Sequence, residues 1–372
     1  MNRDDILLAL VRLGIGHFAE VVAESIDWNS VHALAVEQGL SAVVLDGIEL
    51  LRKKGKDVPM PEKRLLTQWI GEVLQGYEYR YELSCHTIAE MAGFYNSHNC
   101  KMMVLKGYSC SLNWPKPAHR PVGDIDIWQF GEFKKADALL VSEKGIEVDN
   151  SHHHHTVFHW HDFIVENHYD FINVHHHKSN VDLEKELKRL GEKRFINIAE
   201  SADKGCRHHC VELYGEKVYI PSPNLHALFL LKHTMNDFTS FSMTLRQLLD
   251  WGFHIQKYSK EIDWDWLKGI VEKYHMRDFY NCMVAICVED LGFDAGIFQG
   301  VQFNPELKEM VLNDIFRPKF KLNEPDRLIP RLMYKYHRWK GNAWKHQMCY
   351  CESMCSAFWS GLCNHMLKPR TI

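Results

Sequence analysis

The stretch "RPVGDIDIW", residues 120–128, places two carboxylates one residue apart in a run that otherwise has the composition of a buried β-strand. Successive side chains of a strand point to opposite faces, so Asp124 and Asp126 share one face while Ile125 and Ile127 share the other. Two anions side by side repel each other and lose hydration, and a divalent cation is the usual counter-charge. The pattern indicates a metal site, with a Gly-Asp turn as the alternative. The crowding also predicts that amides at both positions leave the metal-free fold as stable or more stable.

The composition is that of a globular protein. The chain has 372 residues, of which 46% are hydrophobic and 25% charged, and this length accommodates two or three domains. The opening "MNRDDILLALVRLG" carries acids before a short apolar stretch and has no small-residue cleavage site, so we expect no signal peptide. No apolar run reaches the roughly 18 to 20 residues that span a bilayer. We therefore expect a cytoplasmic protein with no membrane segment.

Charge and cysteine usage argue against a dedicated nucleic-acid-binding protein and against a disulfide-rich one. The net charge is -4 and no lysine or arginine tract is present, which argues against a nucleic-acid partner. The eleven cysteines are scattered, so they do not form a disulfide framework. The runs "CRHHC" at 206–210 and "CYCESMC" at 349–355 lack the paired spacing of a structural zinc site. The sequence does not indicate an oligomeric state.

Along the chain, the hydrophobic pattern divides the protein into three zones. Residues 1–97 are helical, with one long helix opening at Pro61, residues 98–221 are α+β, and residues 222–372 are again helical. In the middle zone, a helix over 133–145 ends at Gly145. We therefore predict an α+β fold with a small mixed-sheet core between N- and C-terminal helical bundles. Strands are predicted over 101–107, 124–130, 155–160, 163–171 and 216–221.

Upstream of the two aspartates, "VLKGYS" at 104–109 puts a glycine and a hydroxyl directly after an apolar strand and before a short helical segment. Gly107 lets the backbone approach a bound group closely. Amide groups at a helix start, with the Ser109 hydroxyl, suit phosphate oxygens. Lys106 and Arg120 add positive charge. These features indicate a phosphate-binding loop.

Downstream, "FIVENHYDF" carries Glu166 in a strand context, with His168 on the same face. A third carboxylate beside an aspartate pair is what two-metal phosphoryl or nucleotidyl transfer requires. Asp170, two positions beyond His168, is the alternative third carboxylate. We favour Glu166, and we interpret His168 as orienting it, as contacting a phosphate, or as a packed, hydrogen-bonded histidine.

The order of these motifs resembles a known family. "LKG", "RPVGDIDIW" and "VENH", followed by "LHALFLLKH" and "LRQLLDW", are similar to the uncharacterised nucleotidyltransferase family of the DNA polymerase beta-like superfamily, over roughly residues 15–300. The superfamily's usual Gly-Ser or Gly-Gly pair is "GYS" here. The resemblance implies the metal ligands Asp124, Asp126 and Glu166, the phosphate loop Lys106, Gly107 and Ser109, and the phosphate contact Arg120.

The resemblance also implies a reaction. An NTP such as ATP and an acceptor hydroxyl would give NMP-acceptor and pyrophosphate, with Mg2+ or Mn2+ ions held by the carboxylates. The acceptor, a small molecule or a protein hydroxyl, is not identified by the sequence. The alternative is a catalytically inactive nucleotide-binding or scaffold protein with the same fold.

Two other groups allow more than one interpretation. The histidine runs 152–155 and 175–177 offer metal ligands, but contiguous histidines alternate faces on a strand, so we expect loop ends or acceptor contacts rather than convergence. A zinc or nickel protein built on them is the alternative. Arg246 and Asp250 lie four apart on a predicted helix, which favours either an ion pair or a role in the base pocket.

Overall fold

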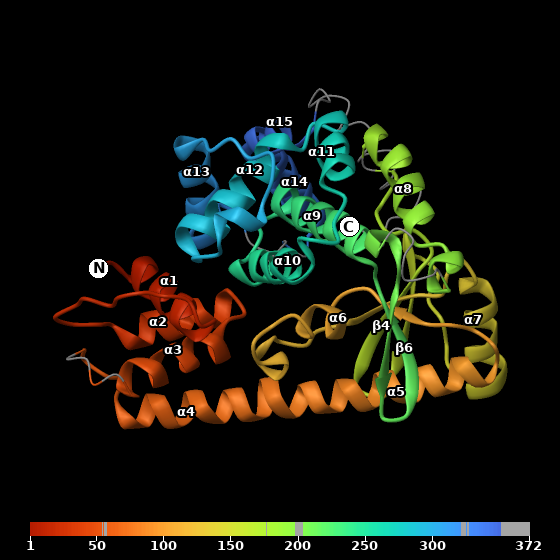
Figure 1. The fold of residues 1–372 in the computed structure, drawn as a ribbon, viewed down its shortest axis with the longest axis horizontal. Helices are drawn as coiled ribbons and strands as arrows, with labels where there is room; N and C mark the ends of the chain where they lie inside the picture. The colour runs from red at the N-terminus through yellow and green to blue at the C-terminus, as the bar shows by residue number, and fades with distance from the viewer. Residues whose placement is uncertain are drawn as a thin grey trace.

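A six-stranded mixed sheet lies at the centre of the computed structural model, and helices cover both of its faces (Figure 1). The structure describes residues 1–350 except 54, 56–57, 176, 198–203, 321–324 and 326. The strand order is β3-β4-β2-β1-β6-β5. The α+β class is thus confirmed. The strands are β1 (Met103–Val104), β2 (Ile125–Trp128), β3 (His155–Trp160), β4 (Phe163–His168), β5 (His209–Leu213) and β6 (Glu216–Ile220).

The pairing of the central strands is mixed. β2 runs antiparallel to β1 and parallel to β4, while β1 and β6 are parallel. The hairpins β3-β4 and β5-β6 form the two ends of the sheet. Because β2 and β4 are parallel neighbours, side chains at matched positions of these two strands lie on one face.

Helices make up most of the remaining chain. They are α1 (Arg3–Gly14), α2 (Trp28–Glu37), α3 (Ser41–Lys53), α4 (Lys63–Val73), α5 (Arg80–Ser97), α6 (Tyr108–Ser111), α7 (Phe133–Leu139), α8 (Lys178–Leu190), α9 (Pro223–Ser240), α10 (Leu245–Tyr258), α11 (Trp264–Lys273), α12 (Arg277–Ala285), α13 (Pro305–Phe316), α14 (Leu328–Gly341) and α15 (Ala343–Cys349).

The predicted long helix is present. α4 continues through a π-helical segment, Leu74–Tyr79, directly into α5. In Figure 1 this helix runs along the lower edge, beneath both the N-terminal helices and the sheet. α2 and α11 begin where Asp27 and Asp263 accept backbone N–H groups of the first turn. Such caps satisfy donors that have no partner within the helix.

Two hydrophobic clusters hold the layers together. One lies between the sheet and α5 and α7, and it takes Ile125 and Ile127 from β2. The other joins α1 to α3 with α8 to α13 and takes Trp128 from the opposite face of β2. The Nε2 of Gln38 donates to the carbonyl of Ile315 at 3.1 Å, so the first and last helical zones are in direct contact.

The structure differs from the predicted elements at β1, β2, β4, β5 and α8. β2 and β4 are shorter than the predicted strands over 124–130 and 163–171. β5 and α8 were not predicted, because both lie at the surface and lack a long apolar run. No residue of β5 is buried, and α8 buries only one face. β1 is shorter than predicted, because the chain turns at Gly107, where φ is +61°. Most of the 349–355 cysteine run lies outside the described residues, and the eight described cysteines are free thiols. None of the described helices is both long and apolar enough to cross a membrane.

The close contact of α1 and α3 gives a stability prediction. A Cβ at Gly47 would lie 2.2 Å from the carbonyl oxygen of Leu10, whereas a Cβ at Gly71 in α4 meets no atom within 4 Å. We expect Gly47→Ala to lower the free energy of unfolding by about 3 kcal/mol, because the two helix backbones must separate. Gly71→Ala should raise it by roughly 0.5 to 1 kcal/mol, because alanine loses less entropy in a helix. Urea denaturation of the two variants measures both effects, and equal midpoints would contradict this packing.

Candidate active site

The register of β2 and β4 assembles the acidic face that the sequence indicated. Asp126 lies opposite Glu166, and Trp128 lies opposite His168. The Nε2 of His168 is 3.1 Å from Oδ1 of Asp126 and 3.5 Å from Oε2 of Glu166. The ligand atoms of these three side chains all lie within 4.8 Å of one another. Two strands that are distant in sequence therefore bring two carboxylates and an imidazole to one point.

Lys106 completes this cluster from the end of β1. Its Nζ is 2.8 Å from Oδ1 of Asp126, whose side chain is almost fully buried. Burial opposes ionisation of Asp126, but Lys106 and His168 hold the pKa of this carboxyl well below its usual range. Burial likewise disfavours a charged Lys106, yet Asp126 and Asp124 raise its pKa. The result is a buried ion pair supported by a protonated imidazole.

The pKa of His168 follows from the same contacts. Burial by itself would lower it, but the hydrogen bonds to Asp126 and Glu166 raise the pKa of His168 to about 9. Glu166 is partly exposed, and although burial acts in the opposite sense, the hydrogen bond from His168 lowers its pKa. Both groups are therefore charged at neutral pH.

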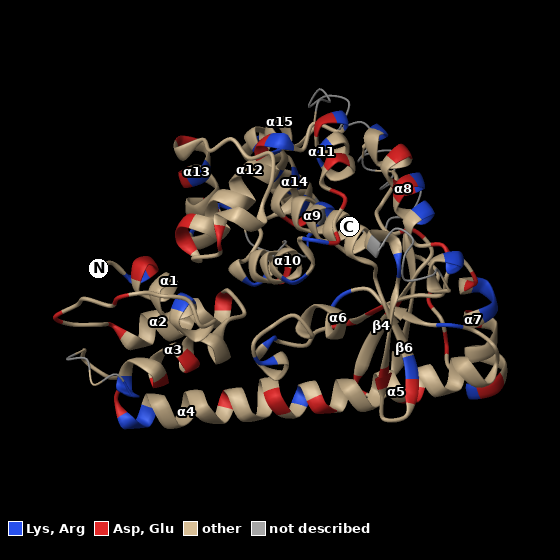
Figure 2. Ribbon diagram, in the orientation of Figure 1, with Lys and Arg blue, Asp and Glu red and all other residues tan. Residues whose placement is uncertain are grey.

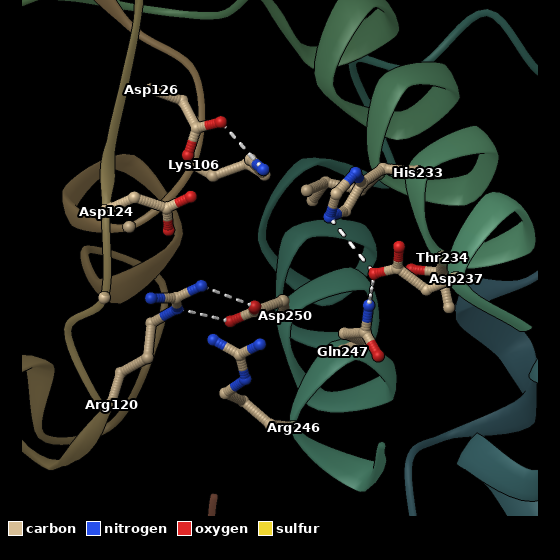
Figure 3. Close-up of a pocket in the computed structure, with 13 residues that line it drawn as sticks. Lys106, Arg120, Asp124, Asp126, His233, Thr234, Asp237, Arg246, Gln247 and Asp250 are labelled. Atoms are coloured by element: carbon tan, nitrogen blue, oxygen red, sulfur yellow. Dashed lines mark hydrogen bonds and ion pairs between the residues drawn. The ribbon is translucent and has the colours of Figure 1, made fainter. Parts of the chain in front are cut away.

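Asp124 stands apart from this cluster, just before β2, on the wall of the adjoining cavity (Figure 3). Its side chain is exposed to that cavity rather than buried in the sheet. Partial desolvation and the negative charge of Asp126 raise the pKa of Asp124. Asp124 therefore carries the kind of unfavourable charge that a bound cation would relieve.

Of the three residues of the predicted phosphate loop, Lys106 and Gly107 line the cavity, and Ser109 is buried in the protein. Gly107 lines the cavity and precedes α6. A Cβ here would meet only the carbonyl oxygen of Asp124, at 3.8 Å, so the positive φ rather than lack of space requires glycine. Ser109 is buried, and its hydroxyl donates to the carbonyl of Lys106 at 3.4 Å. The structure thus gives Ser109 a contact within the loop.

Arg120 is paired with a helix of the C-terminal zone. Its Nε and Nη2 donate to the two oxygens of Asp250, each at 2.8 Å, and Nη1 donates to the carbonyl of Pro121. The Nε1 of Trp114 donates to the same carboxylate at 2.8 Å. Each of the three guanidinium nitrogens donates one hydrogen bond to a protein group, while Arg120 also lines the cavity, so its phosphate contact stays a prediction.

Of the two alternatives for Arg246 and Asp250, the structure does not form the ion pair, because Asp250 turns toward Arg120. Arg246 makes no hydrogen bond or ion pair with any residue that the structure describes, and Figure 3 shows its guanidinium pointing into the cavity. Burial lowers the pKa of Arg246, with the charge of Arg120 acting in the same sense. The cavity therefore holds one cation that is not yet neutralised by a contact.

The cavity has a volume of about 250 Å³ and lies between the sheet and helices α9 and α10. The Nε2 of Gln247 donates to Oδ2 of Asp237 at 2.6 Å, and the Nε2 of His233 is 3.4 Å from the same oxygen. We did not predict these residues or Thr234 from the sequence. The available signal was His233 and Asp237, spaced four apart in an otherwise apolar helix.

Of the two candidates for the third carboxylate, only Glu166 lies beside Asp126. The Asp170 side chain pairs with Lys188 of α8, and its carbonyl lies 3.2 Å from Nδ1 of His168. Glu166 instead lies beside Asp126 on the neighbouring strand. The backbone carbonyl of Asp170 thus fixes the orientation of the His168 ring through Nδ1.

The expectation that the histidine runs do not converge was wrong for one run. The ring centroid of His154 is 4.3 Å from that of His155 and 5.5 Å from that of His168, and the centroids of His155 and His168 are 5.2 Å apart. A bend over 152–154 precedes β3, so neighbouring histidines do not alternate as in a strand, and His155 pairs across the hairpin with His168. Burial lowers the pKa of His155 to about 4. His176 lies outside the described residues.

Comparison with known proteins agrees with the motifs. The chain matches the family described as "Uncharacterised nucleotidyltransferase" over residues 24–292, and it belongs to that family. No curated protein matches it. Among solved structures, a similar one is the crystal structure of an antigenic nucleotidyltransferase-like protein from Paracoccidioides brasiliensis. It has 12% identity and a TM-score of 0.33, over 58% of this chain and 96% of that chain.

The contacts of His168 predict a titration that can be followed directly. In metal-free protein, the His168 ring should titrate near pH 9, and NMR of 15N-labelled histidine measures this. Because the folded pKa lies above the unfolded value of about 6.5, its stabilising contribution is complete below pH 6.5 and is lost as pH rises through 9. A ring that titrates near 6.5 would contradict the contacts with Asp126 and Glu166.

The structure also changes the stability expected for the two aspartate variants. Asp126→Asn leaves Lys106 and His168 without their buried anion and should lower the free energy of unfolding by about 3 kcal/mol. Asp124→Asn removes an exposed, crowded charge and should leave stability unchanged or raise it. Thermal unfolding in EDTA compares the two. Equal destabilisation by both would show that the two carboxylates are not in the different environments described.

Proposed function

We propose that the protein transfers an NMP group from an NTP to a hydroxyl of a small-molecule or protein acceptor and releases pyrophosphate. The observation that carries the proposal is the face formed by Asp124, Asp126 and Glu166, across the cavity from the unneutralised guanidinium of Arg246. This arrangement matches a metal-bound triphosphate. The carboxylates on one wall would bind the metal ions, and the cation on the other would bind phosphate oxygens.

The residues present fit divalent metal ions. Carboxylate oxygens are the ligands that Mg2+ and Mn2+ prefer, and Asp126 and Glu166 offer theirs within 4.8 Å of each other. The ammonium of Lys106, 2.8 Å from Asp126, already occupies the place of a cation beside this carboxylate. Asp124, Asp126 and Glu166 would hold the ions. Bound ions would neutralise the triphosphate and make the acceptor hydroxyl more acidic.

We assign the phosphates to the part of the cavity between the loop at Gly107 and Arg246. The loop at Gly107 presents its backbone toward the cavity, and Lys106 and Arg246 supply positive charge. Arg120 acts through Asp250, because this pair fixes α10 against the loop before β2 and so aims Arg246 at the aspartates. In this arrangement Arg120 positions Arg246, which binds the phosphates.

Glu166 and His168 serve the acceptor. Glu166 is partly exposed, so a hydroxyl can approach it, whereas Asp126 is almost fully buried. His168 donates to both carboxylates and holds them in fixed positions. We therefore assign Glu166 to the acceptor-side ion and to the acceptor proton, and His168 to their orientation.

The surface supports a small-molecule or protein acceptor over a nucleic acid. Figure 2 shows Lys and Arg interspersed with Asp and Glu along the helices rather than gathered on one face. With a net charge of -4, the protein lacks the positive field that polyanions require. A catalytically inactive nucleotide-binding protein is the alternative, and NTP binding without label transfer would identify it.

The proposed reaction predicts which variants lose activity. Incubated with each α-labelled NTP, Mg2+ and a cell lysate, the protein should label one component and release pyrophosphate. Asp124→Asn should reduce transfer by about 1,000-fold or more, because charge neutralisation at the phosphates is lost. Asp265→Asn, whose side chain is 95% exposed on α11, is the matched control and should retain activity. Equal transfer by Asp124→Asn and the parent would exclude the assignment.

Arg246 predicts a binding effect that needs no acceptor. At a hundredfold excess over Kd, Mg2+ with the correct NTP should stabilise the protein by about 2.7 kcal/mol, because ligand binds only the folded state. Arg246→Gln should remove most of this stabilisation without lowering the stability of the unliganded protein, since Arg246 has no ion pair among the described residues. Differential scanning fluorimetry measures both. No shift with any NTP would exclude nucleotide binding.

A further inference from the structure

Three imidazoles meet beside Glu166. His155 begins β3, His168 ends β4, and the register of the hairpin places them opposite each other. His154 closes the group from the preceding bend, where its carbonyl accepts the backbone N–H of Tyr169 and of Asp170, each at 3.0 Å. One nitrogen from each ring lies within 4.8 Å of the other two. The backbone therefore holds the three rings together.

The ring of His155 has an unmet polar requirement. The residue is only 7% exposed, and its Nδ1 is buried without a hydrogen-bond partner among the described residues. An unsatisfied buried nitrogen costs about 1 to 3 kcal/mol. Its other nitrogen, Nε2, is 3.7 Å from Oε1 of Glu166. Among the described residues Nδ1 therefore has no hydrogen-bond partner and Nε2 has only a distant one, so this ring is not committed to a hydrogen bond that an ion would have to break.

We propose that His154, His155 and His168 form a binding site for a first-row transition-metal dication, such as Zn2+ or Co2+. Three imidazole nitrogens at this spacing match the three-ligand sites of such ions, which leave a position for an oxygen. The ion replaces the proton that His168 holds against Asp126 and Glu166, and this proton is released to solvent on binding. The carboxylate of Glu166 lies beside His155 and His168 and supplies that oxygen. Mg2+ does not compete for this site, because it prefers oxygen ligands.

The inference uses the geometry of Glu166 and His168 in the proposed active site but does not depend on nucleotide turnover. The nitrogen-rich site takes a different class of ion from the oxygen-rich face of Asp124 and Asp126. Glu166 lies between the two. An ion at the histidines would therefore bind one oxygen of Glu166 and hold its side chain in place. The other oxygen would remain for the Mg2+ site.

Metal binding by the full chain tests this inference. EDTA-treated protein, without nucleotide, is titrated with Co2+ in a large excess of Mg2+ and followed by visible absorption. We expect one equivalent of Co2+ to bind with the absorption of a nitrogen-ligated ion. His155→Ala should weaken that affinity by about 100-fold. The control is His159→Ala, on the same strand but exposed and opposite Ile164, and it should bind as the parent does.

A second readout uses the parent protein, in case His155→Ala does not fold. In 15N-histidine NMR spectra, substoichiometric Co2+ should broaden His154, His155 and His168 before it affects His159. Broadening of exposed histidines first, equal affinity of His155→Ala and His159→Ala, or displacement of Co2+ by Mg2+ would each overturn the site.

The variant Asp124→Asn separates this inference from the proposed function. It should lose nucleotidyl transfer and retain Co2+ binding, because Asp124 is not among the three histidines or their bound carboxylate. Absence of transfer by the parent with Co2+ binding intact would exclude the enzyme activity alone. Transfer with no Co2+ site would exclude the histidine site alone.

Discussion

The structure depends on a buried charge cluster centred on Asp126. This carboxylate is 1% exposed, and it accepts from Lys106 at 2.8 Å and from His168 at 3.1 Å. An isolated buried carboxylate would be strongly unfavourable, so β2 is stable in this place only when the end of β1 and the end of β4 lie on either side of it. The charges therefore require the same strand neighbours that the hydrophobic faces favour.

A second ion pair connects this centre to the helices. Arg120 binds both oxygens of Asp250 and so fastens the loop before β2 to α10. As a consequence, Arg246 on the same helix faces Asp124 and Asp126 across the cavity (Figure 3). The C-terminal helices thus do more than cover the sheet, because they form the wall that opposes the carboxylates. The family to which the chain belongs is defined over both parts, residues 24–292.

Glu166 lies between two chemically different environments. Toward Asp126 the donors are carboxylate oxygens, and toward His155 they are imidazole nitrogens. Oxygen donors select hard ions such as Mg2+, and imidazoles select transition metals. The parallel pairing of β4 with β2 and its antiparallel pairing with β3 place this one carboxylate between both sets. The sheet order thus creates two ligand groups that share His168 at the end of one strand.

The sequence by itself determined what depends on local periodicity. The alternation of side chains along a strand predicted that Asp126 would lie on the opposite face from Ile125 and Ile127. The glycines predicted the turn at Gly107 and the helix end at Gly145. Only the tertiary structure decided which partners meet. Asp250 pairs with Arg120 rather than with Arg246 one helical turn away, and His154 and His155 converge on His168. Such partners are set by strand register and by the contact of the helices with the sheet, and spacing along the chain does not encode either.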